Sequence, residues 1–296
     1  MREIVVPPDE PRKKLENFLK KRFPVGYVSR LFRKNGVRLN GKRARPETIV
    51  SPGDRVQIYI RFEQSSKVSV KATVDHLDLD VVFEDKDLLV INKPAGLAVH
   101  EGKKISKRQS VLGQLAAKYR NERITPKLVH RLDKETSGLL IVAKSDNVAE
   151  ELETLFEEAK VGKNYLSLLV GCLPQDVGRI DLSLPGREGK PVRAATRFKV
   201  EKRFSETTLV RVTIETGRMH QIRLHFSILG YPVVMDDQHG HFEFNKRFRK
   251  QYGLRRQFLH ARSLTLEYRG KKRAWSAPLP DDLKRTLALL EKSATQ

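Results

Sequence analysis

Residues 130–138 read HRLDKETSG and run directly into the apolar residues 139–142, LLIV. A short apolar run of this kind predicts a buried strand, and the polar, turn-rich residues before it predict a loop at the end of that strand. Loops held by a rigid scaffold are common places for reactive side chains. This loop contains Asp133. Because a lone aspartate in a loop is most often a turn or capping residue, its role depends on the rest of the chain.

The pattern around this stretch, in residues 81–296, is that of one α/β unit. Ser110 and Ser145 each precede a segment with apolar residues at helical spacing, so each is expected to cap a helix. Two further helices are expected at residues 219–229 and around residues 283–290. Strands are expected at residues 81–83, 88–92, 139–142, 165–170, 192–204, 209–215 and 263–268, the 192–204 and 209–215 segments forming a hairpin.

The first 62 residues have the pattern of a separate small domain. Apolar residues recur at helical spacing in residues 15–19 and again in residues 28–32, and Asn35-Gly36 is a good helix stop. Asn40-Gly41 is a strong hairpin signal, and residues 56–60 alternate as a strand. Two short helices and a small sheet are therefore predicted, followed by a polar linker at residues 63–80.

The positive charge is concentrated in this small domain. The whole chain of 296 residues has a net charge of +22. Residues 1–62 contain 16 Lys and Arg against 6 Asp and Glu, a net charge of +10. On the second predicted helix, Arg30, Arg33 and Lys34 fall away from the apolar stripe, where they can face a phosphate backbone. So large a charge, spread along the chain, points to a folded surface that binds an anionic partner.

The small domain resembles the S4 RNA-binding domain. The resemblance rests on residues 12–18, on SRLFRKNGVRLNG at residues 29–41 and on Pro52-Gly53-Asp54. It implies an RNA-binding module, although modules of this type occur in proteins of many functions.

Four more motifs accompany residues 130–138 in the larger unit. They are VINKPAGLAVH at residues 90–100, KNYL at residues 163–166, TGRMHQIRLH at residues 216–225 and FLHA at residues 258–261. In order and approximate spacing they resemble the RluA family of pseudouridine synthases, from about residue 12 to residue 280. The small domain in front, with DDQHG at residues 236–240, is most similar to the RluC branch, which modifies large-subunit ribosomal RNA. The resemblance implies a central mixed, largely antiparallel sheet flanked by helices, with a central RNA-binding cleft.

The resemblance also implies roles for individual residues. Asp133 is the expected nucleophile, and Arg223 supplies the cation that keeps its carboxylate ionised in a closed pocket. Tyr165 contacts the target base. Arg131 is expected to enter the space that a flipped base leaves, and Arg218 and His220 are further RNA-facing positions. Lys93 and His130 are expected at the site or facing RNA, with less definite roles.

The reaction that the resemblance implies needs no cofactor. It breaks the bond from uracil N1 to the sugar, rotates the base and joins C5 to the sugar, with no redox change, phosphate transfer or net hydrolysis. No metal is expected either, because the eight histidines include no His-Glu-x-x-His motif and the chain has a single cysteine. That cysteine, Cys172, lies in an apolar stretch and is expected to pack as a small hydrophobe.

Other functions remain open from the sequence. A non-catalytic RNA-binding factor of ribosome assembly would explain the charge and the small domain equally well, and a synthase acting on transfer RNA has the same motifs. A hydrolase using Asp133 on a glycosidic bond would need a second acid or base. Partners are expected to be structured RNA, most of all 23S ribosomal RNA or its assembly intermediates, and no membrane. No signal segment is seen, so a cytoplasmic monomer is the expectation.

Overall fold

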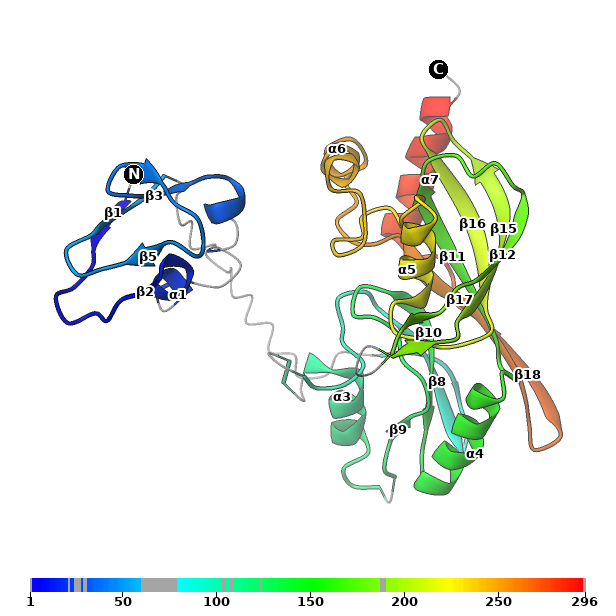
Figure 1. Cartoon of the computed structure of the whole chain (residues 1–296). Coiled ribbons are helices and arrows are strands. Elements are labelled where there is room, and N and C mark those ends of the chain that lie inside the picture. Colours follow the sequence, from blue (N-terminus) through cyan, green and yellow to red (C-terminus); the bar gives the residue numbers. More distant parts are fainter. Residues whose placement is uncertain are drawn as a thin grey trace. The chain divides into compact units, whose positions relative to one another are not determined.

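The computed structural model of the chain describes residues 2–20, 22–23, 28, 31–59, 79–102, 105–106, 109–122, 124–186 and 190–294. The chain divides into two compact units, residues 1–73 and 74–296 (Figure 1). Most of the predicted linker at residues 63–80, and Arg30 of the predicted basic helix, lie outside the described residues. No helix in the described part of the chain is both long and apolar enough to cross a membrane.

The N-terminal unit is built on a four-stranded antiparallel sheet in the order β1 (Arg2–Val5), β6 (Arg55–Ile58), β3 (Val37–Leu39) and β4 (Lys42–Arg43). A second pair joins β2 (Lys13–Lys14) to β5 (Ile49–Val50), and α1 spans Leu15–Lys20. The predicted hairpin at Asn40-Gly41 is confirmed. Both residues have positive φ, 50° and 79°, as the tight turn between twisted strands requires.

A small apolar core holds this unit together. Its buried side chains come from α1, from the helical residues near Leu31 and from the inner face of the sheet. They include Leu15, Phe18, Leu19, Val28, Leu31, Val37, Val50, Val56 and Ile58. Arg33 and Lys34 are exposed, which agrees with their predicted position away from the apolar stripe.

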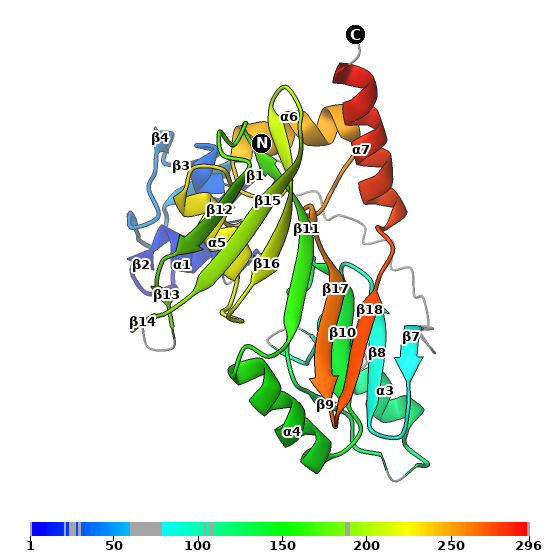
Figure 2. The ribbon, with the colours of Figure 1, turned by 90° about the vertical axis from the view of Figure 1, so that its right-hand side faces the viewer.

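The larger unit contains a ten-stranded sheet. Its main path runs β12-β15-β16-β11-β17-β10-β8-β7, while β18 pairs with β17 and β9 pairs with β10 (Figure 2). The strands along this path are β12 (Val177–Asp181), β15 (Ala195–Arg203), β16 (Thr207–Ile214), β11 (Gly162–Val170), β17 (Leu259–Tyr268), β10 (Ser137–Ala143), β8 (Leu88–Lys93) and β7 (Asp80–Glu84), with β9 (Lys127–Leu128) and β18 (Lys271–Ser276) beside it.

One pairing in this sheet is parallel. Strand β10 runs parallel to β17, with Ser137 opposite His260 and Gly138 opposite Ala261. The other pairings recorded for the sheet are antiparallel. The prediction of a mixed, largely antiparallel sheet is therefore confirmed.

Strand β10 lies at the centre of the apolar core, and all seven of its residues are buried. Leu140 and Val142 pack on one face with α3 (Val111–Lys118) and α5 (Gln221–Ile228). Leu139 and Ile141 pack on the other face with α4 (Asp146–Glu157). Because both faces are covered, the strand is apolar throughout instead of alternating. The predicted helix caps are also confirmed, since Ser110 Oγ and Ser145 Oγ accept bonds from the helix N–H groups of Gly113 and Val148.

A third apolar cluster joins α6 (Phe242–Tyr252) and α7 (Asp281–Ala294) to residues of β11 and β16. Helix α6 was not predicted. Seven of its eleven residues are charged or amides, and the apolar stripe of Phe244 and Phe248 is narrow. The short strands β9, β12 and β18 were also not predicted.

One expectation about the larger unit is wrong, and the start of one predicted helix is corrected. Cys172 is exposed, because β11 ends at Val170 and the chain turns at Gly171, which has a φ of +86°. The helix expected at residues 219–229 begins only at Gln221, because His220 has a left-handed backbone with a φ of 53°. Arg218 and His220 therefore precede the helix and do not lie on it.

Candidate active site

Asp133 lies in the loop that leads into β10, and the buried side chain of Lys93 holds this loop through hydrogen bonds to backbone carbonyl groups. The ammonium group of Lys93 donates hydrogen bonds to the carbonyl oxygens of Pro94, Leu97 and Lys134, at 2.8, 2.8 and 3.1 Å. The backbone N–H of Gly96 also donates to the Lys134 carbonyl, at 2.9 Å. Burial lowers the pKa of Lys93 to about 7, although Glu135 and Asp133 act in the opposite direction. Lys93 therefore supports the loop and does not face RNA.

The end of the loop is fixed from the side of β17. Gln257 donates to Thr136 Oγ1 at 2.7 Å, and Ser137 Oγ lies 3.0 Å from His260 Nδ1. Gly138 has a φ of +110°, and a Cβ atom there would meet the carbonyl oxygen of Ala261 at 2.2 Å. The close parallel pairing of β10 with β17 thus requires glycine at this position.

His130 holds the beginning of the loop and does not face RNA. Its Nε2 accepts a hydrogen bond from the backbone N–H of Ile141 at 2.9 Å, and its ring stacks on Phe156 at 4.6 Å. Burial, with a smaller contribution from the charge on Lys163, lowers the pKa of His130 to about 3. Its ring is thus neutral at physiological pH and serves as a hydrogen-bond acceptor.

The Asp133 side chain opens into a pocket of about 480 Å³, which includes open solvent. All three residues expected to be catalytic line it, and so do all three RNA-facing residues expected in this unit. The lining residues that carry the argument are Arg131, Asp133, Tyr165, Arg218, His220 and Arg223. Four separate parts of the chain therefore meet here, namely the 130–138 loop, β11, the continuous stretch at residues 214–223 and the start of β17.

Arg223 is shared between two aspartates. Its Nη1 donates to Asp133 Oδ2 at 2.9 Å, while Nε and Nη2 donate to the two oxygens of Asp236 at 2.7 and 2.8 Å. Burial would lower the pKa of Arg223, but its hydrogen bonds to Asp236 and Asp133 raise that pKa above the usual value. Burial would likewise raise the pKa of Asp236, and its bonds from Arg223 and from the backbone of residues 238 and 239 lower it instead. Both groups are therefore charged.

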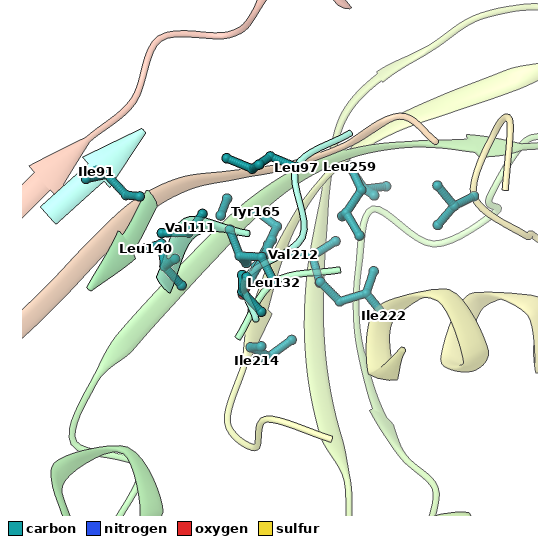
Figure 3. Packing of buried hydrophobic residues seen from close by; sticks show 14 of the residues in the cluster. Ile91, Leu97, Val111, Leu132, Leu140, Tyr165, Val212, Ile214, Ile222 and Leu259 are labelled. Carbon is teal, nitrogen blue, oxygen red and sulfur yellow. The ribbon is translucent and has the colours of Figure 1, made fainter. Parts of the chain in front are cut away.

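Tyr165 forms the floor of the pocket from β11, at a bulge between Asn164 and Tyr165 in the pairing with β17. The side chain is buried beside Leu132 and Val212 in the main core cluster (Figure 3). Burial and the negative charge of Asp133 raise the pKa of its hydroxyl above the usual value. The ring therefore offers a neutral phenol to whatever enters the pocket.

His220 lies on the other side of Asp133 from Arg223. Its Nε2 is 3.8 Å from Asp133 Oδ1, and its Nδ1 is 3.0 Å from Nε2 of His239. Burial lowers the pKa of His220; Asp133 acts against this, and Arg223 and His239 add to it. The left-handed backbone at this residue turns the side chain toward the pocket, as is common for residues held in unfavourable conformations at functional sites.

Arg131 and Arg218 are exposed residues of the pocket lining. Arg218 is held by a bond from Nε to the Arg193 carbonyl at 3.1 Å. Asp236 and His239 were quoted in the sequence for their likeness to one branch of the family, but no role was predicted for either. The acidic pair followed by Gln-His-Gly was the only signal, and it does not show which arginine or histidine these residues meet.

Comparisons with known proteins agree with this geometry. The family model "RNA pseudouridylate synthase" matches residues 87–228. A protein of Yersinia pestis named ribosomal large subunit pseudouridine synthase C is 36% identical to this chain. The match covers 99% of this chain and 96% of that protein. The protein of the same name from Escherichia coli O157:H7 is also 36% identical, over 97% of this chain and 96% of its own length.

A solved structure shows the same similarity. Human RNA pseudouridylate synthase domain containing 4 superposes with a TM-score of 0.60 at 26% sequence identity, covering 72% of this chain and 93% of that one. Near-complete coverage at 36% identity, the matching family model and the shared fold lead to one conclusion: this chain belongs to the RNA pseudouridylate synthase family.

Proposed function

We propose that this protein converts uridine to pseudouridine in 23S ribosomal RNA, with Asp133 as the nucleophile. The observation that carries the proposal is the Asp133 carboxylate in an open pocket, paired through one oxygen with a buried arginine. The relatives named for the large ribosomal subunit support this substrate. Transfer RNA is the alternative substrate, and a non-catalytic assembly factor is not favoured, since it has no use for a paired carboxylate beneath a pocket.

The ion pair suits Asp133 to nucleophilic attack. Arg223 donates to Oδ2 at 2.9 Å and so places a positive charge beside the carboxylate. The other oxygen, Oδ1, lies 3.8 Å from Nε2 of His220, which is beyond hydrogen-bond distance. Asp133 thus keeps one oxygen for the substrate.

The isomerisation balances without any added group. Asp133 either attacks C1′, releases the base and is itself displaced when C5 later bonds to C1′, or it removes the C2′ proton as the base leaves to form a glycal and returns that proton when C5 bonds to C1′. The detached uracil turns within the pocket, and C5 bonds to C1′. The proton on C5 then leaves and N1 gains a proton. Tyr165 contacts the base throughout, and its hydroxyl assists this proton transfer.

A uridine within folded RNA must be flipped out before it can enter the pocket, which costs a few kcal/mol. Arg131 is exposed beside Asp133, and its planar guanidinium suits it to stack on the neighbouring bases. Arg218 and His220 contact the backbone or the flipped nucleotide from the opposite side of the pocket.

The N-terminal unit adds affinity for RNA as an S4-like domain. In the proposed organisation, residues 1–62 bind RNA, residues 63–80 act as a linker and residues 81–296 catalyse. Arg33 and Lys34 are exposed and basic, and Arg30, which precedes the described helical residues, belongs to the same predicted face. The enzyme acts as a cytoplasmic monomer.

Release of tritium from RNA labelled at uridine C5 tests the proposal. Native protein and Asp133→Asn are each incubated with large-subunit ribosomal RNA and, separately, with transfer RNA. Release by the native protein alone, and only from ribosomal RNA, is the expected result. If both RNAs bind and neither releases tritium, the catalytic proposal fails and an assembly factor becomes the better description. Release of tritium from transfer RNA alone would contradict the proposal that ribosomal RNA is the substrate.

A further inference from the structure

The two oxygens of Asp133 face two different side chains. The loop at residues 236–240 bonds both of these side chains. Oδ2 accepts from Arg223 at 2.9 Å, and Oδ1 faces His220 at 3.8 Å. The far side of Arg223 is held by Asp236, and the far ring nitrogen of His220 meets His239. Asp236 and His239 are three residues apart, in the turn that precedes α6.

We infer that Asp236 and His239 are positioning residues that control the nucleophile from behind, Asp236 by orienting Arg223 and His239 by orienting His220. The inference rests on the proposed function, since it assigns how Asp133 is kept reactive. Neither residue is among those that line the pocket, so each acts on Asp133 through the side chain that lies between.

Asp236 fixes the direction of the arginine. A guanidinium has five N–H donors in a planar fork, and Asp236 takes one from Nε and one from Nη2. The remaining edge of the fork, at Nη1, then points at Asp133 Oδ2. Both partners are buried, at 4% and 2% exposed, so the bidentate pair fixes the guanidinium plane relative to α5.

The position of Asp236 is itself determined by the surrounding fold. Its Oδ1 also accepts from the backbone N–H groups of Gln238 and His239, at 2.9 and 3.0 Å. Asn245 of α6 donates to the Asp236 carbonyl and accepts from the Met235 N–H, both at 2.8 Å. Met235 takes a φ of 64° to allow this turn, a backbone conformation that is unfavourable for an ordinary side chain. A strained turn held by these hydrogen bonds is the arrangement expected of a rigid support.

His239 acts on the other oxygen through charge. The hydrogen bond between the two rings places at most one proton between His220 Nδ1 and His239 Nε2. Burial disfavours a further proton on His220, and so do the neighbouring Arg223 and His239, against the opposite effect of Asp133 and Asp236. His220 therefore stays neutral to lower pH, and Oδ1 stays free. Protonated His220 would form an ion pair with Oδ1 and reduce its reactivity.

The first test compares Asp236→Asn with Asp237→Asn. Asp237 is the next residue and carries the same charge, but its side chain is 81% exposed and its oxygen is 3.9 Å from Arg223. We expect kcat for tritium release from large-subunit ribosomal RNA to fall about 100-fold in Asp236→Asn, the size of effect that a displaced catalytic geometry gives, with RNA binding retained. Asp237→Asn should remain within about twofold of the native protein. Equal activity of the two variants would overturn the role of Asp236.

A second variant separates positioning from folding. In Asp236→Ala, added formate can supply the missing carboxylate, so we expect it to raise kcat while leaving Asp133→Ala inactive. A variant that had only lost stability would gain nothing from formate, and that outcome contradicts the inference.

His239→Ala tests whether His239 controls His220 and so the Oδ1 atom of Asp133. His241→Ser is its control, because the His241 side chain caps α6 and serine is a good cap. We expect the acid limb of kcat against pH to move to higher pH in His239→Ala and to stay in place in His241→Ser. Titration of His220 by NMR, in protein without RNA, should show the same rise in its pKa. An unchanged histidine titration refutes this role whether or not the reaction proceeds. Native protein that releases no tritium, in contrast, refutes the proposed function.

Discussion

The loop at residues 130–138 and the loop at residues 236–240 each present an aspartate to the same arginine, but the two carboxylates are satisfied very differently. Asp236 is buried and accepts four hydrogen bonds, two from Arg223 and two from backbone N–H groups. Asp133 accepts one from Arg223, and its side chain is 18% exposed. Under the proposed function, one fold therefore makes a structural anion and a reactive one from the same residue type. The fully bonded carboxylate orients the cation, and the partly bonded one keeps an oxygen for chemistry.

The largest difference between the two loops should appear when Asp133 is changed to asparagine. The amide has the same shape but is a poor nucleophile, so tritium release should fall at least about 1,000-fold. Because the side chain makes one bond at a pocket surface, the free energy of unfolding should change by no more than about 0.5 kcal/mol. Urea unfolding measures the change in the free energy of unfolding, and single-turnover kinetics measure the rate of tritium release. A large loss of stability would mean that Asp133 resembles Asp236 more than its contacts suggest.

Arg223→Lys should damage both loops. Lysine keeps the charge but loses the fork that bonds Asp236 and Asp133 together. We expect kcat to fall about 100-fold. We also expect the free energy of unfolding to fall by about 3 kcal/mol, because the buried Asp236 loses its bidentate partner. Thermal unfolding and kcat are measured on the same preparation. A variant with normal stability and low kcat would show that Asp236 does not depend on the arginine.

Gly138→Ala should act on the 130–138 loop alone. The positive φ and the contact with the Ala261 carbonyl force β10 away from β17, at a cost of at least about 2 kcal/mol. Because the loop shifts with the strand, kcat should fall as well. Gly253→Ala is the matched control, since Gly253 also has a positive φ, of +74°, but a Cβ there meets no atom within 4 Å. It should lose stability without loss of kcat.

The smallest effect should come from pH acting on His130. Its pKa in the folded state is about 3, against 6.5 for an ordinary histidine. The unfolded chain therefore binds the proton first as the pH falls, and stability is lost between about pH 6.5 and pH 3. His130→Gln keeps an acceptor for the Ile141 N–H and cannot titrate there. Urea unfolding at pH 7 and pH 4.5 should show a smaller loss for the variant than for the native protein, while its activity at pH 7 stays near normal. An equal loss would assign the acid sensitivity to other groups.

Much of the fold follows from local patterns. The buried run at β10, the serine caps of α3 and α4 and the Asn40-Gly41 turn each depend on a few neighbouring residues, and the structure confirms them. The exposure of Cys172 was not foreseen, because an apolar run does not reveal where its strand ends. Helix α6 was missed because most of its residues are charged or amides and its apolar stripe, Phe244 and Phe248, is narrow.

The candidate site was harder to predict in its contacts than in its residues. The family motifs marked Asp133, Tyr165 and Arg223, and all three line one pocket. The bond from Arg223 to Asp236 and the pairing of His220 with His239 depend on how a turn and two helices pack, which no local pattern encodes. His130 and Lys93 belong to conspicuous motifs, yet they bond backbone groups beneath the loop instead of facing RNA.

The parallel pairing of β10 with β17 also affects the order in which the enzyme becomes active during its synthesis. The end of the nucleophile loop is fastened to residues made more than a hundred positions later, through Ser137 to His260 and through Arg256, which bonds both Ser137 and Asp282. A nascent chain that ends before these residues already contains the whole 130–138 motif, but it lacks the strand and helix that hold the loop in place. The 130–138 loop therefore cannot be held in its final position until residues 256–282 have been made, after the basic N-terminal unit.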